Sequence, residues 1–79
     1  MTKVTSIRQL RLACSAEEPE DFFISLGLAR SSKSIMLTED GHFDIVNEID
    51  DTQQVLTAGE LFTHSNIGQA IANGAFYAY

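Results

Sequence analysis

The sequence predicts a single small α+β domain over residues 1–79, with an antiparallel sheet of three or four strands. An N-terminal helix and two short C-terminal helices are expected to flank this sheet. Three observations favour the class. Apolar residues recur at helical spacing near the N-terminus, the turn dipeptide Asp40-Gly41 separates two strand-like runs, and helix-capping residues follow in the last third of the chain. Seventy-nine residues suffice for one domain and not for two.

The first helix is expected over residues 6–16. Its apolar residues recur at intervals of three and four, which aligns them in one stripe that includes Cys14. Ser6 or Thr5 would cap this helix by accepting a hydrogen bond from a first-turn amide. Cys14 is interpreted as a small core hydrophobe, because the sequence near it offers no neighbour that would activate a reactive thiol.

A first strand is expected over residues 22–28, which are rich in Phe and Ile. Every second residue from Phe22 to Leu28 would share one face, and Gly27 would mark a bulge or the end of the strand. The run A-R-S-S-K-S, residues 29–34, is interpreted as a polar connection to the next strand.

A β-hairpin is expected from residues 34–38 and 43–49, joined by the turn at Asp40-Gly41. Residues 53–56 would add one more short strand. The side chains expected on the core face of the hairpin are Phe43, Ile45 and Ile49. Those expected on the opposite face are Asp44, Val46 and Glu48. The sheet would therefore have a core face and a face with carboxylates.

The last third of the chain has clear helix boundaries. Thr57 and Glu60 fit a capping box, in which each side chain accepts a hydrogen bond from the backbone amide of the other. Ser65 can cap the helix that follows, and Gly74 suits the left-handed position at its C-terminal end. The aromatic tail, residues 75–79, is expected to pack on the core; an exposed tail would instead offer a partner contact.

The charge is unevenly distributed along the chain. The net charge is −6, yet residues 1–33 hold all five bases and four acids. Residues 34–79 hold seven acids and no Lys or Arg. Such a surface repels phosphate backbones and anionic membranes and attracts a basic protein surface. Alternatively, the acids only confer solubility.

The sequence contains no recognisable catalytic, metal-binding or phosphate-binding motif. His42, His64 and Cys14 lie far apart in the sequence and lack the spacing of metal ligands. The spacing from Gly27 to the Ser32-Lys33-Ser34 run resembles a phosphate-binding loop, but Ser stands where its second glycine is needed. We therefore expect a protein that is not an enzyme and that has no cofactor and no metal.

The location of the protein follows from what the sequence lacks. No apolar run approaches the roughly 18 residues of a membrane span, and the N-terminus has no apolar signal segment. A single cysteine cannot form an internal disulfide, which favours a reducing compartment. We expect a cytoplasmic protein, monomeric and with no contact to membranes.

Six carboxylates surround the expected second strand of the hairpin and are our candidate partner-binding residues. They are Glu39, Asp40, Asp44, Glu48, Asp50 and Asp51. Strand residues rise about 3.3 Å each, so Asp44 and Glu48 would lie roughly 13 Å apart on one face. Carboxylates in such a row would pair with Lys and Arg in a cationic groove that normally holds a phosphate backbone.

Three segments carry a resemblance to known proteins. They are R-S-S-K-S-I, F-D-I-V-N-E-I-D-D-T and E-L-F-T-H-S-N-I-G-Q-A-I-A-N-G-A-F-Y. Together they resemble small phage and mobile-element accessory proteins that include anti-CRISPR proteins directed at type I-C surveillance complexes. The resemblance spans most of residues 21–77 and carries over no functional residue. It implies a stoichiometric inhibitor that binds an RNA-guided complex in a bacterial host cell and blocks its engagement of target DNA.

Two functional hypotheses follow. In the first, the chain is a DNA mimic that occupies a basic, DNA-engaging surface on a subunit of such a complex. In the second, it is a small interaction module that docks through its C-terminal helix and aromatic tail.

Overall fold

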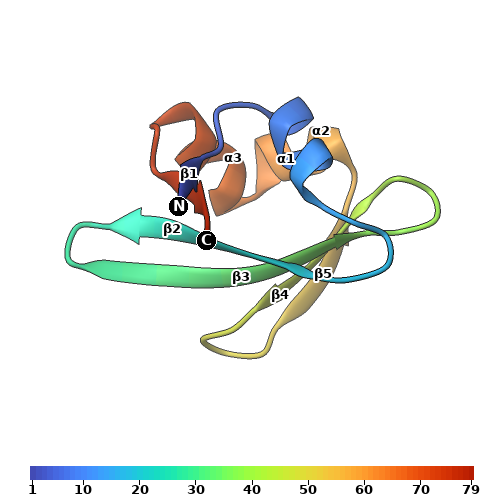
Figure 1. The fold of residues 1–79 in the computed structure, drawn as a ribbon, viewed down its shortest axis with the longest axis horizontal. Coiled ribbons are helices and arrows are strands. Elements are labelled where there is room, and N and C mark those ends of the chain that lie inside the picture. The colour runs from blue at the N-terminus through green and yellow to red at the C-terminus, as the bar shows by residue number, and fades with distance from the viewer.

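The computed structural model describes all residues 1–79 and contains a six-stranded antiparallel sheet with three helices over one face (Figure 1). The helices are α1 (Ile7–Ala13), α2 (Ala58–His64) and α3 (Asn66–Ala72). The strands are β1 (Thr2–Lys3), β2 (Glu20–Leu26), β3 (Ala29–Leu37), β4 (Phe43–Asn47), β5 (Gln53–Leu56) and β6 (Phe76–Ala78), in the spatial order β1-β6-β2-β3-β4-β5. The α+β class is confirmed, whereas the expected count of three or four strands is too low.

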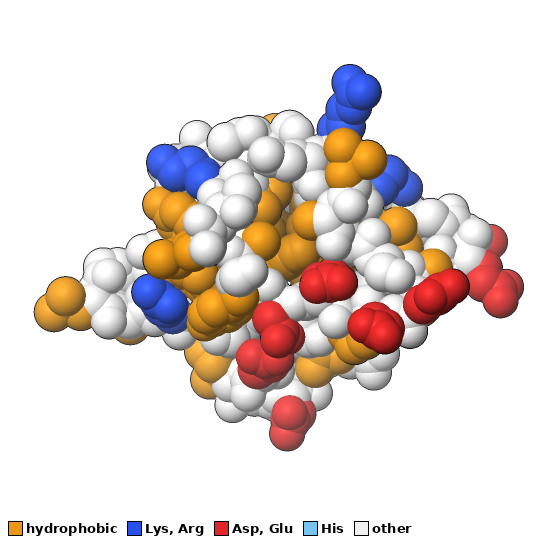
Figure 2. Space-filling model, in the orientation of Figure 1, with side chains coloured by type: hydrophobic (Ala, Val, Ile, Leu, Met, Phe, Trp, Pro, Cys, Tyr) orange, Lys and Arg blue, Asp and Glu red, His pale blue; other side chains and the backbone are white.

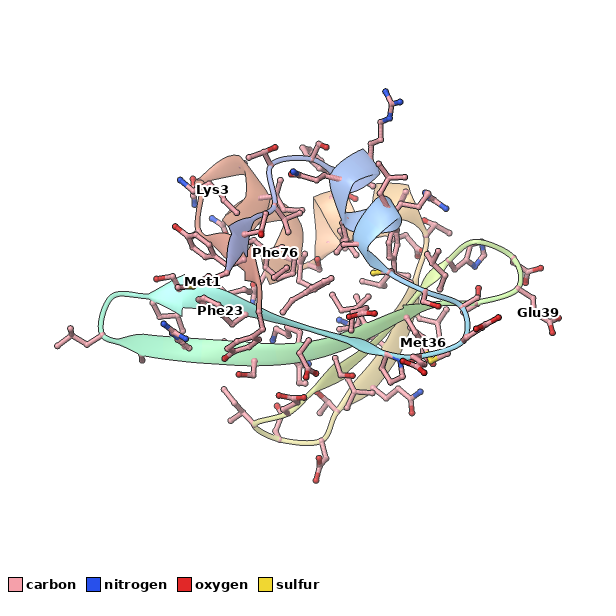
Figure 3. The ribbon with its side chains drawn as sticks, in the orientation of Figure 1. Met1, Lys3, Phe23, Met36, Glu39 and Phe76 are labelled. Carbon is pink, nitrogen blue, oxygen red and sulfur yellow. The ribbon has the colours of Figure 1, made fainter.

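The two termini supply the additional strands. The tail forms β6, which lies between β1 and β2 and pairs with both. The backbone N–H of Val4 donates to the carbonyl of Phe76 at 2.8 Å, and the N–H of Ser25 donates to that of Ala75 at 2.8 Å. Phe76 is fully buried between the helices and the sheet (Figure 3), so the expectation that the tail packs on the core is confirmed.

The expected polar connection at residues 29–34 is wrong, because these residues form the first two thirds of β3. A two-residue turn at Gly27 (φ +71°) and Leu28 joins β2 directly to β3. The polar side chains of the run find partners on the sheet: Arg30 lies over the ring of Phe23, and Lys33 donates to Asn47. The turn projects beyond the helices (Figure 1), which leaves Leu28 exposed rather than on a core face.

The core lies between the three helices and one face of the sheet. Its fully buried larger side chains include Leu10, Phe22, Ile35, Phe43, Ile45, Leu61, Ile67 and Phe76. Phe43 and Ile45 take their expected places. Ile49 does not: it is 72% exposed, because β4 ends at Asn47 and the chain turns before a further inward position is reached.

Helix boundaries follow the capping signals closely. Ser6 caps α1 by accepting from the N–H of Gln9 at 3.0 Å. This helix ends three residues earlier than expected, because Cys14 already has extended backbone angles. Both bonds of the Thr57–Glu60 capping box are present. Each of the three helices has seven residues, far too few to cross a bilayer.

Candidate functional site

The six candidate acids follow β4 from one end to the other, and we call them the acidic band. The band comprises Glu39, Asp40, Asp44, Glu48, Asp50 and Asp51. The first two lie in the β3–β4 turn, Asp44 lies within β4, and the last three lie in the β4–β5 turn. The strands on either side of β4, which are β3 and β5, contribute no acid to the band. The acids therefore form an elongated rather than a compact group.

The β3–β4 turn presents Glu39 and Asp40 to solvent at one end of the molecule (Figure 3). The N–H of Gly41 donates to the carbonyl of Thr38 at 3.0 Å, and Gly41 takes the left-handed φ of +78° that typically ends a three-residue hairpin loop. Arg11 of α1 donates to the carbonyl of Gly41 at 2.8 Å. Arg11 therefore stabilises the backbone of this turn, while the side chains of Glu39 and Asp40 stay exposed to solvent.

The β4–β5 turn is stabilised by one of the band's own acids. The Asp50 carboxylate accepts from the N–H of Thr52 at 3.1 Å and from its hydroxyl at 2.7 Å. These bonds hold the pKa of Asp50 below its ordinary value, because they stabilise the ionised carboxylate. Asp51 adopts a positive φ of 57°, a conformation that Asp tolerates better than most residues.

Lys33 anchors this acidic turn to the sheet. It is the buried charged residue of the domain, at 8% exposure, and its ammonium donates to the Asn47 side chain. Asn47 in turn donates to the Thr52 hydroxyl at 2.8 Å. Burial lowers the pKa of Lys33, and the charge of Asp50 opposes that change. Lys33 lines a polar cleft of about 230 Å³ between the sheet and the start of α3.

Asp44 and Glu48 project from the open face, by which we mean the sheet face opposite the helices. Asp44 lies between the buried Phe43 and Ile45, and alternation therefore turns it outward. It accepts from the Gln53 side chain at 2.9 Å and is half-buried. Glu48 is exposed, and its backbone N–H donates to Ser32 on β3 at 3.1 Å. Asp44 thus has a structural partner, whereas the carboxylate of Glu48 has none.

Asp21 is an acid of the open face that the sequence prediction missed. The register pairs Asp21 with Ser34 and Ser34 with Val46, which puts Asp21 on the same face as Asp44, two strands away from β4. The strand predicted over residues 22–28 starts two residues earlier in the structure, at Glu20, and therefore includes Asp21. No alternation of polarity marks this segment, because two acids precede three consecutive apolar residues, and so its membership of the strand depends on the pairing with β3.

The opposite end of the open face is basic and aromatic. Phe23 is 2% exposed there, because the rings of Tyr77 and Tyr79 and the guanidinium of Arg30 cover it. Lys3 lies over the ring of Tyr77 at 5.9 Å. Figure 3 shows Lys3 and Phe23 at one end of the molecule and Glu39 at the other. Figure 2 shows the acids over the lower right of the molecule, with the bases toward its top and left.

The residues weighed for chemistry do not come together. No group of three or more His, Cys, Asp or Glu side chains is placed to hold a metal ion. The Gly27 to Ser34 segment forms a hairpin turn and a strand, and not a phosphate-binding loop.

Cys14 is buried, and its burial raises the pKa of the thiol to about 12 from 9.0. The thiolate fraction at pH 8 is then about a thousandfold below that of an ordinary cysteine. We expect dithiobis(nitrobenzoate) to label the folded protein slowly at pH 8 and to label it at once in denaturant. Rapid labelling of the folded protein, with unchanged circular dichroism, would contradict this structural role.

The fold and these charges define a small α+β domain whose sheet is acidic at one end. Comparisons of the chain with models of known protein families, with curated proteins and with solved structures find no match.

Proposed function

We propose that this chain is a non-enzymatic binding protein that inhibits a nucleic-acid-binding host defence complex by occupying its basic, DNA-engaging surface. The acidic band carries this proposal. Its six carboxylates follow β4 and the two turns at its ends, in a stretch of the chain that contains no Lys or Arg after Lys33. In this role the protein acts as a DNA mimic, without a cofactor.

A row of carboxylates suits a groove that is built for phosphates. β4 rises about 13 Å over four residue steps, and its turns extend the band at both ends. Lys and Arg in the groove would exchange their counterions for the carboxylates, much as they do when DNA binds. Complementary charge also accelerates the encounter, so that a small protein can compete with DNA for the same surface.

The resemblance of residues 21–77 to anti-CRISPR proteins suggests the particular target. We infer that the target is a subunit of the type I-C surveillance complex in the cytoplasm of a bacterial host, bound by a monomer of this chain. The segment F-D-I-V-N-E-I-D-D-T, which contributes to the resemblance, contains four of the six band acids.

The second hypothesis is docking through the C-terminal helix and the aromatic tail, and the tail has little exposed surface to offer. Phe76 is fully buried and Tyr77 is half-buried, since β6 lies between two other strands. Tyr79, at 59% exposed, is the aromatic residue of the tail that a partner would reach. The acidic band, by contrast, presents exposed charged side chains at both of its ends.

The proposal is tested with purified type I-C surveillance complex and a labelled target duplex in a gel mobility assay. Adding this chain before the DNA should abolish the shifted band once chain and complex are equimolar, because both ligands compete for one basic surface. Adding it after the DNA should have a much smaller effect. Unchanged DNA binding at a large molar excess of the chain would refute the proposed target.

A further inference from the structure

Strand β5 is an unprotected edge of the sheet. It pairs with β4 on one side and has no strand on the other. Its sequence, Q-Q-V-L, contains no charge and no proline, the residues that commonly prevent further pairing at an edge. The opposite edge differs: β1 has only two residues, and one of them is Lys3. Of the two edges, β5 is the one that can accept another strand.

The register identifies the backbone groups that β5 offers. The N–H of Asn47 donates to the carbonyl of Thr52, which makes these two residues a hydrogen-bonded pair. Because bonded and non-bonded pairs alternate along an antiparallel ladder, Gln54 and Leu56 also bond to β4. The N–H and C=O groups of Gln53 and Val55 therefore point away from the sheet. They provide two donors and two acceptors at the spacing of a strand.

The side chains around this edge favour a cationic occupant. Val55 is 52% exposed and lies opposite Asp44 on the open face. The β4–β5 turn places Asp50 and Asp51 at one end of the edge, and Glu60 follows at the other end, at the start of α2. The bonds from Thr57 keep the pKa of Glu60 below its ordinary value. An added strand would thus have carboxylates at both ends and beside its middle.

We propose that an extended segment of the basic partner adds to β5 as a seventh strand. Its backbone bonds to Gln53 and Val55, an apolar side chain covers Val55, and its Lys or Arg side chains reach Asp44 and Asp51. This inference rests on the proposed function, because it describes how the partner of the acidic band is held. A second copy of the chain is a poor occupant of the same edge, since each copy carries a net charge of −6.

The probe is the heptapeptide T-K-T-V-T-K-T, which as a strand carries one Val flanked by two Lys on a single face, and binding is followed by amide hydrogen exchange of the full-length chain by NMR. Binding should slow exchange at Gln53 and Val55 and leave Gln54 and Leu56 unchanged, because the last two already bond to β4. The peptide T-E-T-V-T-E-T should have no effect. Protection of Gln53 and Val55 without any peptide, rising with protein concentration, would show a second copy at the edge and overturn the proposal.

A pair of variants at one position separates the backbone from the side chain. Val55→Pro removes an outward N–H, replaces the Val side chain by a ring and is compatible with an edge strand, whereas Val55→Thr keeps that N–H and a β-branched side chain. We expect Val55→Pro to weaken binding of the basic peptide about fivefold or more and Val55→Thr to have a smaller effect. Thermal unfolding of both variants checks that they fold. Equal affinity of folded Val55→Pro and wild type would overturn strand addition.

The peptide experiment tests strand addition separately from the target proposed above. If the basic peptide adds to β5 but the surveillance complex is unaffected by the chain, the edge site stands and the proposed target fails. If the chain inhibits the complex while Gln53 and Val55 gain no protection with the peptide, the acidic band acts without strand addition and this inference fails.

Discussion

Replacing Gly68 by alanine is expected to destabilise the domain by about 3 kcal/mol, at the upper end of the cost of overpacking. An added Cβ at this position in α3 would lie 2.3 Å from the carbonyl oxygen of Phe62 and 2.6 Å from its Cα. Both atoms belong to the backbone of α2, so they cannot rotate away, and the two helices would have to separate. For a domain of this size the melting temperature should fall by roughly 12–24 °C.

Gly59→Ala is the matched control for this change. Gly59 also lies in a helix, but its nearest neighbour is the Thr57 hydroxyl at 4.0 Å, and its φ is not positive. Alanine should leave stability unchanged or raise it by about 0.5–1 kcal/mol, because it restricts the unfolded chain. Equal melting temperatures of the two variants, measured by circular dichroism, would contradict the close approach of α2 and α3.

Phe76→Ala is expected to cost about 3–5 kcal/mol of unfolding free energy, the range for a fully buried Phe. Phe76 is 0% exposed, its ring lies 5.5 Å from that of Phe22, and its strand joins β1 to β2. A domain of 79 residues has roughly 4–12 kcal/mol in total, so this one truncation removes a large share of its stability. Urea unfolding measures the loss.

The control for Phe76 is Phe62→Ala, which removes the same side chain from a site that is 54% exposed. We expect it to cost less than about 1 kcal/mol, since little buried area is lost. The comparison also bears on docking through the tail: deletion of residues 76–79 would remove β6 and unfold the sheet. Substitutions at Tyr79 are therefore the appropriate test of a tail contact. Similar losses for the two Phe variants would contradict a structural role for the tail.

The parts of the fold that were predictable are those fixed by local chemistry. The Thr57–Glu60 capping box, the Ser65 cap and the left-handed Gly74 each depend on residues within one or two helical turns. The Asp40-Gly41 turn likewise forms as expected. Such features need no knowledge of the rest of the chain.

The parts that were missed depend on distant partners. Residues 29–34 have a polar composition, and they become a strand because Phe23, Asn47 and the β2 backbone lie beside them in the fold. The tail becomes an interior strand because β1 and β2, which are distant in the sequence, lie on either side of it.

Sequence alone could name the acids of the candidate site but could not separate their roles. Asp50 accepts two hydrogen bonds that shape its own turn, and Asp44 accepts one from Gln53. Glu39 and Glu48 are exposed. Changing Asp44 or Asp50 would therefore disturb the β4–β5 connection as well as the charge, and this makes Glu39 and Glu48 the better positions for a test of binding.

The most direct test of the acidic band is the affinity of two variants with equal net charge for the purified type I-C complex. Glu39→Gln with Glu48→Gln removes two charges from the band, and Gln69→Lys with Asn73→Lys adds two exposed charges to α3 and the residue that follows it. Each pair of changes contributes +2, which takes the net charge from −6 to −4. We expect the band variant to bind at least tenfold more weakly than wild type and the helix variant to bind within about threefold of it. Equal affinity of the two variants would contradict a localised acidic site.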